Sequence, residues 1–141
     1  MKLKRIEHVG IVVRDVEASR DLWERCLGIP MASIENHPLA PVRLAMFPVG
    51  ESFVELLAGT TSDGKYTRMV ADGKGGLNHI CFEVEDIDQA LDELKQKGVA
   101  LLDQQARVGQ GGSRIAFLDP SGTEGCLIEL VEWPQSPQQG S

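Results

Sequence analysis

Two histidines and two glutamates recur in matching surroundings along the 141-residue chain, and these residue types together indicate metal chemistry. His8 and His79 lie 71 positions apart on otherwise apolar runs, while Glu55 and Glu129 stand in the similar tripeptides VEL and IEL. Two imidazoles and two carboxylates are a normal ligand set for a divalent transition metal such as Co, Zn, Ni, Mn or Fe. Such a set leaves positions for water or substrate.

Each of the four residues, taken alone, is compatible with an ordinary core or strand-end position. Both glutamates, however, are flanked by aliphatic residues. A buried carboxylate costs several kcal/mol unless it is paired or bound to a metal, so the joint pattern favours a metal site. His37, the third histidine, lies in a proline-rich stretch without a repeat partner, and we expect a surface residue there.

The elements that must position these residues are repeated. Residues 6–28 and 77–98 share one layout: an apolar, β-branched run that carries the histidine, then an aspartate, then an amphipathic stretch closed by a glycine. Asp15 and Asp86, also 71 positions apart, are typical helix N-caps. The sequence therefore predicts a strand followed by a helix in each half, and the shared spacing indicates an internal duplication.

Hydrophobic periodicity refines this prediction. In the first helix the stripe Ala18, Leu22, Cys26 is expected to face inward, and in the second helix the stripe Ile87, Leu91, Leu94. Alternating and turn-bounded runs predict strands at residues 42–48, 53–57, 78–84, 114–118 and 127–132, and a short helix over Lys65–Ala71.

Composition sets the protein class. With 42% hydrophobic and 25% charged residues, the chain is typical of one globular domain. A net charge of −7 argues against a general nucleic-acid surface. No run approaches the roughly 20 apolar residues of a membrane span, and the N-terminal residues lack a signal-peptide core, so we expect a cytoplasmic protein. The three cysteines, Cys26, Cys81 and Cys126, are predicted to be buried free thiols.

Two further features are less specific. Arg43 and Arg114 keep the 71-residue spacing on predicted strands. They are interpreted as solvated strand residues, with anion steering as the alternative. The glycine-rich segment RVGQGG (107–112) precedes a strand rather than a helix, so it does not fit a dinucleotide fingerprint, and we expect a flexible rim.

Four stretches resemble the vicinal oxygen chelate superfamily, which includes glyoxalases, bleomycin resistance proteins and dioxygenases, and within it the methylmalonyl-CoA epimerases. They are IEHVGIVVRDVEAS, FVELLAGTTSDGKY, GGLNHICFEVEDIDQALDELKQKGV and RVGQGGSRIAFLDPSGTEGCLIEL. The resemblance implies an α+β fold of two βαβββ modules around a metal site. Within the single domain that the length predicts, residues 1–141, it places module one at about 3–58, a linker at about 59–75 and module two at about 76–132. The tail, 133–141, has two prolines and no periodicity beyond Trp133, so we expect it to fray.

The resemblance further implies a function. The metal ligands carry over to His8, Glu55, His79 and Glu129. A divalent ion would act as a Lewis acid on an acyl-CoA thioester and stabilise the enolate formed when the α-proton leaves. Glu129 is the expected base, with Glu55 as its partner on the other face. A homodimer is also expected, without nucleic acid or membrane partners.

Some positions depart from the epimerase pattern, and alternatives stay open. Asn78 stands where these enzymes usually have the first of two adjacent histidines, and the strand that carries Arg43 lacks a glutamate that is proposed as a base in some epimerases. A glyoxalase-type lactoylglutathione lyase uses the same ligand set. A non-catalytic binding or resistance protein is the alternative from another class, and an extradiol dioxygenase fits less well because it prefers one carboxylate.

Overall fold

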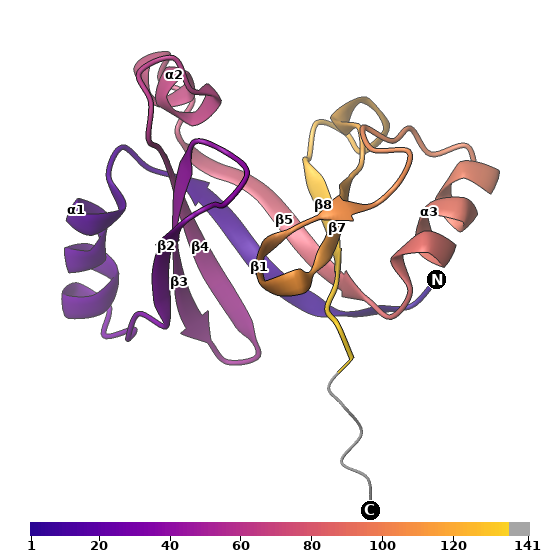
Figure 1. The fold of residues 1–141 in the computed structure, drawn as a ribbon, viewed down its shortest axis with the longest axis horizontal. Helices are drawn as coiled ribbons and strands as arrows, with labels where there is room; N and C mark the ends of the chain where they lie inside the picture. The colour runs from indigo at the N-terminus through magenta and orange to yellow at the C-terminus, as the bar shows by residue number, and fades with distance from the viewer. Residues whose placement is uncertain (136–141) are drawn as a thin grey trace, which may run out of the picture. The chain divides into compact units, whose positions relative to one another are not determined.

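The computed structural model describes residues 1–135. The described residues divide into two compact units: Arg5–Cys81, the first unit, and Met1–Lys4 with residues 82–135, the second unit. The first unit contains most of β1 (Leu3–Val12), then α1 (Val16–Arg20), a π-helical segment (Asp21–Cys26), β2 (Ser33–Asn36), β3 (Val42–Val49), β4 (Ser52–Gly59), α2 (Lys65–Ala71) and the start of β5 (Gly76–Val84) (Figure 1).

The strands of the first unit follow the order β2-β3-β4-β1 and then the start of β5. β3 and β4 form an antiparallel hairpin in which Met46 pairs with Glu55, and β1 runs parallel to β4 with Gly10 beside Glu55. Paired residues on neighbouring strands point to the same face of a sheet. Because His8 pairs with Phe53, which lies two residues before Glu55 on the same strand, His8 and Glu55 point to the same face of the sheet.

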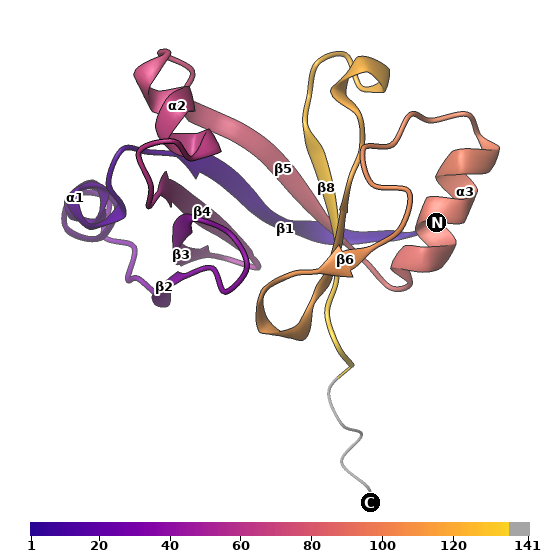
Figure 2. The ribbon, with the colours of Figure 1, turned by 45° about the horizontal axis from the view of Figure 1, so that its top comes forward.

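The other face of this sheet carries much of the unit's apolar core. Phe47 and Leu56 are fully buried there against Val16 of α1 and against Trp23, and Figure 1 shows α1 beside β2, β3 and β4. At one end of the ligand-bearing face, Met69 of α2 packs against the apolar cluster that contains Leu44 and Leu57. Figure 2 shows α2 close to β4, which it contacts.

The predicted stripe of the first helix was wrong. Asp15 does cap the helix and accepts the backbone N–H groups of Glu17 and Ala18, but Ala18, Leu22 and Cys26 are exposed. The helix becomes π-helical from Asp21, where backbone bonds run from residue i to i+5 and change the angular position of each side chain. The inward positions are consequently taken by other residues, Val16 and Trp23.

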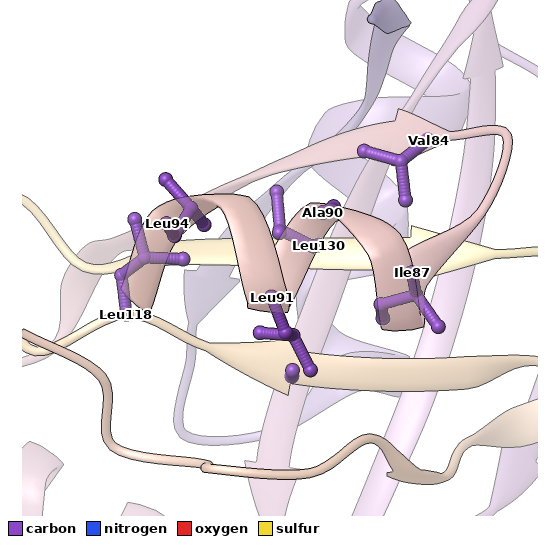
Figure 3. Close-up of a cluster of buried hydrophobic side chains, with 8 residues drawn as sticks. Val84, Ile87, Ala90, Leu91, Leu94, Leu118 and Leu130 are labelled. Atoms are coloured by element: carbon purple, nitrogen blue, oxygen red, sulfur yellow. The ribbon is translucent and has the colours of Figure 1, made fainter. Parts of the chain in front are cut away.

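The second unit is built around α3 (Ile87–Gln96). Asp86 caps this helix by accepting the N–H of Gln89, and Gly98, with φ of 76°, follows its end. The predicted inward stripe is confirmed, since Ile87, Leu91 and Leu94 pack with Leu130 in one apolar cluster (Figure 3). The other elements are the end of β5, β6 (Arg107–Val108), β7 (Arg114–Phe117), β8 (Ile128–Glu132) and two short 3₁₀ turns.

The duplication is confirmed at the level of topology. One half runs β1-α1-β2-β3-β4 and the other β5-α3-β6-β7-β8, so each is a βαβββ module, with α2 between them. The strand orders correspond as well, β2-β3-β4-β1 and β6-β7-β8-β5. This α+β arrangement is the one that the resemblance implied. A single domain with the predicted module boundaries stays a prediction.

The matched arginines are partly exposed strand residues, as predicted, and they also have matched partners. Arg43 Nε donates to Glu17 at 2.6 Å, and Arg114 donates two hydrogen bonds to Asp88, at 2.6 and 2.8 Å. Each bond ties a β-strand to the first turn of the helix in its own module. The Arg114 guanidinium lowers the pKa of the Asp88 carboxyl.

Several smaller expectations can be compared with the structure. All three cysteines are free, but only Cys81 is buried, while Cys26 and Cys126 are exposed. Gln110–Gly112, in the expected flexible rim, forms a 3₁₀ turn. The frayed tail falls largely on residues 136–141, outside the described residues. Among the helices of the described part of the chain, none has the length and apolar character needed to cross a membrane.

We predict that the two helices respond differently to truncation of a leucine. Leu91→Ala should lower the free energy of unfolding by about 2–5 kcal/mol, because Leu91 is 2% exposed and its loss leaves a cavity. Leu22→Ala should cost about 0.5 kcal/mol or less, because Leu22 is 51% exposed. Urea unfolding of both variants measures the difference, and equal costs would contradict the exposed position of Leu22.

Candidate metal centre

Three predicted ligands meet within the first unit. His8 comes from β1, Glu55 from β4 and His79 from β5, and all three side chains are buried. The Nε2 atoms of the two histidines are 2.9 Å apart, and Glu55 Oε1 lies 3.6 Å from the first and 3.7 Å from the second. The imidazole rings are nearly perpendicular, at 86°. Three donor atoms therefore converge on one small region.

The other nitrogen of each imidazole has a fixed acceptor. The Nδ1 atom of His8 is hydrogen-bonded to the carboxylate of Glu7, and the Nδ1 atom of His79 lies 2.8 Å from the side-chain oxygen of Asn78. An ionised carboxylate and an amide oxygen only accept hydrogen bonds, so each Nδ1 carries the hydrogen. In the neutral ring, each Nε2 then presents a lone pair.

This arrangement fits a divalent cation. Two lone pairs that face each other at 2.9 Å repel unless a positive charge lies between them, and the carboxylate of Glu55 adds a third donor. Two ligands about 2.1 Å from one ion, at right angles to each other, are about 3.0 Å apart, and no two of its ligands are more than about 4.2 Å apart. All three measured separations lie within these limits.

The remaining predicted residues fall elsewhere. Glu129, the fourth predicted ligand, belongs to the second unit, where it is buried on β8 and pairs with Phe117 of β7. Its participation in the site stays a prediction. His37 is half-exposed and accepts the backbone N–H of Leu39 at 3.0 Å, as expected for a turn residue rather than a ligand.

Sequence reasoning missed two residues that shape this site. Glu7, which is 3% exposed, was not predicted to belong to the site, although its position directly before a histidine was a usable signal. Gly10 was also passed over. A glycine inside a strand often marks a close approach of another group, and here the group is the imidazole of His79.

The wall beside Glu55 is apolar. Met46 of β3 pairs with Glu55, and Leu44 lies two residues away on the same face, while β3 as a whole contains no aspartate or glutamate. Arg43, which directly precedes Leu44, lies on the opposite face and pairs with Glu17 of α1. The site face of β3 is therefore apolar and carries no carboxylate that could accept a proton.

Comparisons with known proteins identify the family. The sequence profile of the Glyoxalase/Bleomycin resistance protein/Dioxygenase superfamily matches residues 7–117. The mitochondrial methylmalonyl-CoA epimerase of Bos taurus is 33% identical over 92% of this chain and 75% of its own length. The ethylmalonyl-CoA/methylmalonyl-CoA epimerase of Cereibacter sphaeroides is 34% identical over 91% of this chain and 97% of its own.

A solved structure is similar over nearly the whole chain. It is a variant of Streptomyces coelicolor methylmalonyl-CoA epimerase in complex with 2-nitronate-propionyl-CoA, with a TM-score of 0.87 and 33% sequence identity. The match covers 96% of this chain and 100% of the other.

We predict that the protein retains about one divalent ion per chain after dialysis, and that His79→Ala loses it, because one of two facing imidazole donors is removed. His37→Ala is the matched control and should retain the ion, since that side chain lies in a turn. Elemental analysis of the dialysed proteins measures both. Full metal content in His79→Ala would contradict the assignment.

Proposed function

Because the chain belongs to the glyoxalase/bleomycin resistance/dioxygenase superfamily, we propose that it is a metal-dependent epimerase of methylmalonyl-CoA or a closely related acyl-CoA. The observation that carries the proposal is the convergence of two imidazole Nε2 atoms and the Glu55 carboxylate within the first unit. Support for the substrate class comes from similarity to epimerases over 92% and 91% of the chain.

The proposed ligand set is His8, Glu55, His79 and Glu129, two residues from each module. A divalent ion held by this set supplies a Lewis acid that favours negative charge on a substrate carbonyl oxygen. Co, Zn, Ni, Mn and Fe all accept a mixture of imidazole and carboxylate donors, so the ligand types do not select one of them.

The two glutamates are the proposed proton carriers. The α-hydrogen of a malonyl thioester is acidified by the neighbouring thioester carbonyl. The carboxylate of Glu129 takes this proton, and the electron pair of the C–H bond moves into the carbonyl to give an enolate. A ligand carboxylate that swings away from the ion can carry a proton. Glu55 in this protonated form therefore returns a proton to the opposite face of the same carbon, which inverts its configuration. Glu55 is left as the carboxylate, while Glu129 holds the abstracted proton. The reverse reaction exchanges the two roles.

The apolar wall of β3 supports this assignment. Since β3 carries no carboxylate, it cannot supply a further proton acceptor beside Glu55. Met46 and Leu44 instead suit the small alkyl group that distinguishes methylmalonyl from malonyl thioesters. We further propose a homodimer, because β2 and β6 end their strand orders and unpaired sheet edges tend to be covered. The cytoplasmic location stays a prediction.

We predict that the metal-loaded protein inverts methylmalonyl-CoA of one configuration and exchanges its α-proton in deuterated water. Proton NMR follows the exchange, and chromatographic separation of the two intact CoA thioesters, which are diastereomers, follows the inversion. The hemithioacetal of methylglyoxal and glutathione is the comparison substrate. Turnover of the hemithioacetal alone would replace the epimerase by a glyoxalase-type lyase, and turnover of neither would favour a binding protein.

We also predict that Glu129→Gln slows α-proton exchange by about 100-fold or more, since the amide cannot accept the proton. Glu24→Gln is the control, because Glu24 is a solvent-facing residue of the helical segment Asp21–Cys26, which packs on the opposite face of the sheet, and should exchange at the wild-type rate. Deuterium incorporation at equal metal loading compares the two variants. A wild-type exchange rate in metal-loaded Glu129→Gln would rule out this residue as the base.

A further inference from the structure

We propose that Gly10 and Asn78 are positioning residues for His79: Gly10 leaves the space in which its imidazole lies, and Asn78 holds the ring with Nε2 toward the metal. This inference rests on the proposed function, because it concerns the same metal site. It adds two residues that touch neither substrate nor ion and that act through one ligand.

The strand order determines where Glu55 and His79 can meet. β1 lies between β4, which carries Glu55, and β5, which carries His79. The two ligands therefore have to meet over the central strand. The residue of β1 that pairs with Glu55 is Gly10, so this is the position over which the His79 side chain must reach. Any side chain of β1 at this position would occupy the same space.

The imidazole of His79 lies in direct contact with the backbone at Gly10. A Cβ atom added to Gly10 would lie 2.1 Å from Cε1, 2.4 Å from Nδ1 and 2.7 Å from Nε2 of His79. The ring thus rests directly on the bare backbone of β1. Gly10 has no positive φ, so its conformation does not require glycine. The requirement is one of space alone, and alanine at this position should displace the imidazole rather than strain the strand.

A hydrogen bond to Asn78 fixes the rotation of the His79 ring. Space above Gly10 fixes where the imidazole lies, but it does not decide which nitrogen faces His8. The side-chain oxygen of Asn78, 2.8 Å from Nδ1 of His79, decides this because it accepts the Nδ1 hydrogen. The lone pair of Nε2 is then free of hydrogen and available to bind the metal. This atom lies 2.9 Å from Nε2 of His8 and 3.7 Å from Glu55 Oε1.

The duplicated module provides an internal comparison. Glu7 occupies the position that Asn78 occupies in the other module, 71 residues on, and it likewise contacts Nδ1 of its histidine. The position of Gly10 is taken by Cys81, which is fully buried. Both modules therefore hold the Nδ1 atom from the preceding residue, whereas only the position in β1 has been left without a side chain.

Cobalt binding without substrate tests the inference. Gly10→Ala should weaken Co²⁺ affinity by at least about 10-fold and change the visible absorption of bound Co²⁺, because the His79 ring is displaced. Gly122→Ala is the control, since a Cβ there meets Ala100 at an ordinary 3.5 Å, and it should bind Co²⁺ like wild type. Wild-type affinity and spectrum in Gly10→Ala would overturn the role of Gly10.

A second pair of variants covers the case in which Gly10→Ala does not fold. Asn78→Leu removes the acceptor and should weaken Co²⁺ binding by about 10- to 100-fold, whereas Asn78→Asp keeps an acceptor oxygen and should restore the affinity. Equal affinity of Asn78→Leu and wild type would overturn the role of Asn78. So would a failure of Asn78→Asp to bind better than Asn78→Leu.

The outcomes separate this inference from the proposed function. A wild-type protein that binds Co²⁺ but does not act on methylmalonyl-CoA defeats the proposed function, while the variants still decide the roles of Gly10 and Asn78. An active wild type with unaffected Gly10→Ala and Asn78→Leu defeats the inference alone. A wild type that binds no divalent ion overturns both.

Discussion

Two imidazole lone pairs that face each other at 2.9 Å are the constraint on which the site depends. Both histidines are buried, and each has its Nδ1 hydrogen directed to an acceptor on the preceding residue. In this state neither ring can relieve the repulsion by donating to the other. A cation beside the two nitrogens and the Glu55 carboxylate converts an unfavourable group of buried acceptors into a favourable one.

The fold meets this constraint through the alternation of strands. Side chains in a strand point alternately to opposite faces, so one face of the first sheet can be apolar against α1 while the other presents His8 and Glu55. A shift of one residue in the pairing of β1 with β4 would turn His8 toward α1. The apolar packing of Phe47 and Leu56 therefore fixes the position of the polar side chains on the other face.

Much of the fold and of the histidine positions could be predicted from the sequence because the same strand-helix pattern occurs in both halves. The spacing of His8 and His79, the capping aspartates and the inward stripe of α3 are local patterns with direct structural meaning. The first helix was mispredicted because a π-helical segment changes the period on which the stripe depends. The arginine pairs were missed because Arg43 and Glu17 are distant in sequence and only the tertiary fold joins them.

The residues that precede the two histidines differ in charge, and this difference bears on how the site binds its ion. Glu7 is a carboxylate, so it makes the imidazole of His8 a stronger donor. Asn78 orients His79 equally well but adds no charge. If position 78 carried a glutamate as position 7 does, then these two carboxylates, Glu55 and the proposed ligand Glu129 would place four negative charges around one divalent ion. A neutral amide reduces this excess and leaves the ion better able to attract a substrate oxygen. The departure from the usual epimerase histidine is therefore compatible with the proposed chemistry, because the position needs only an acceptor.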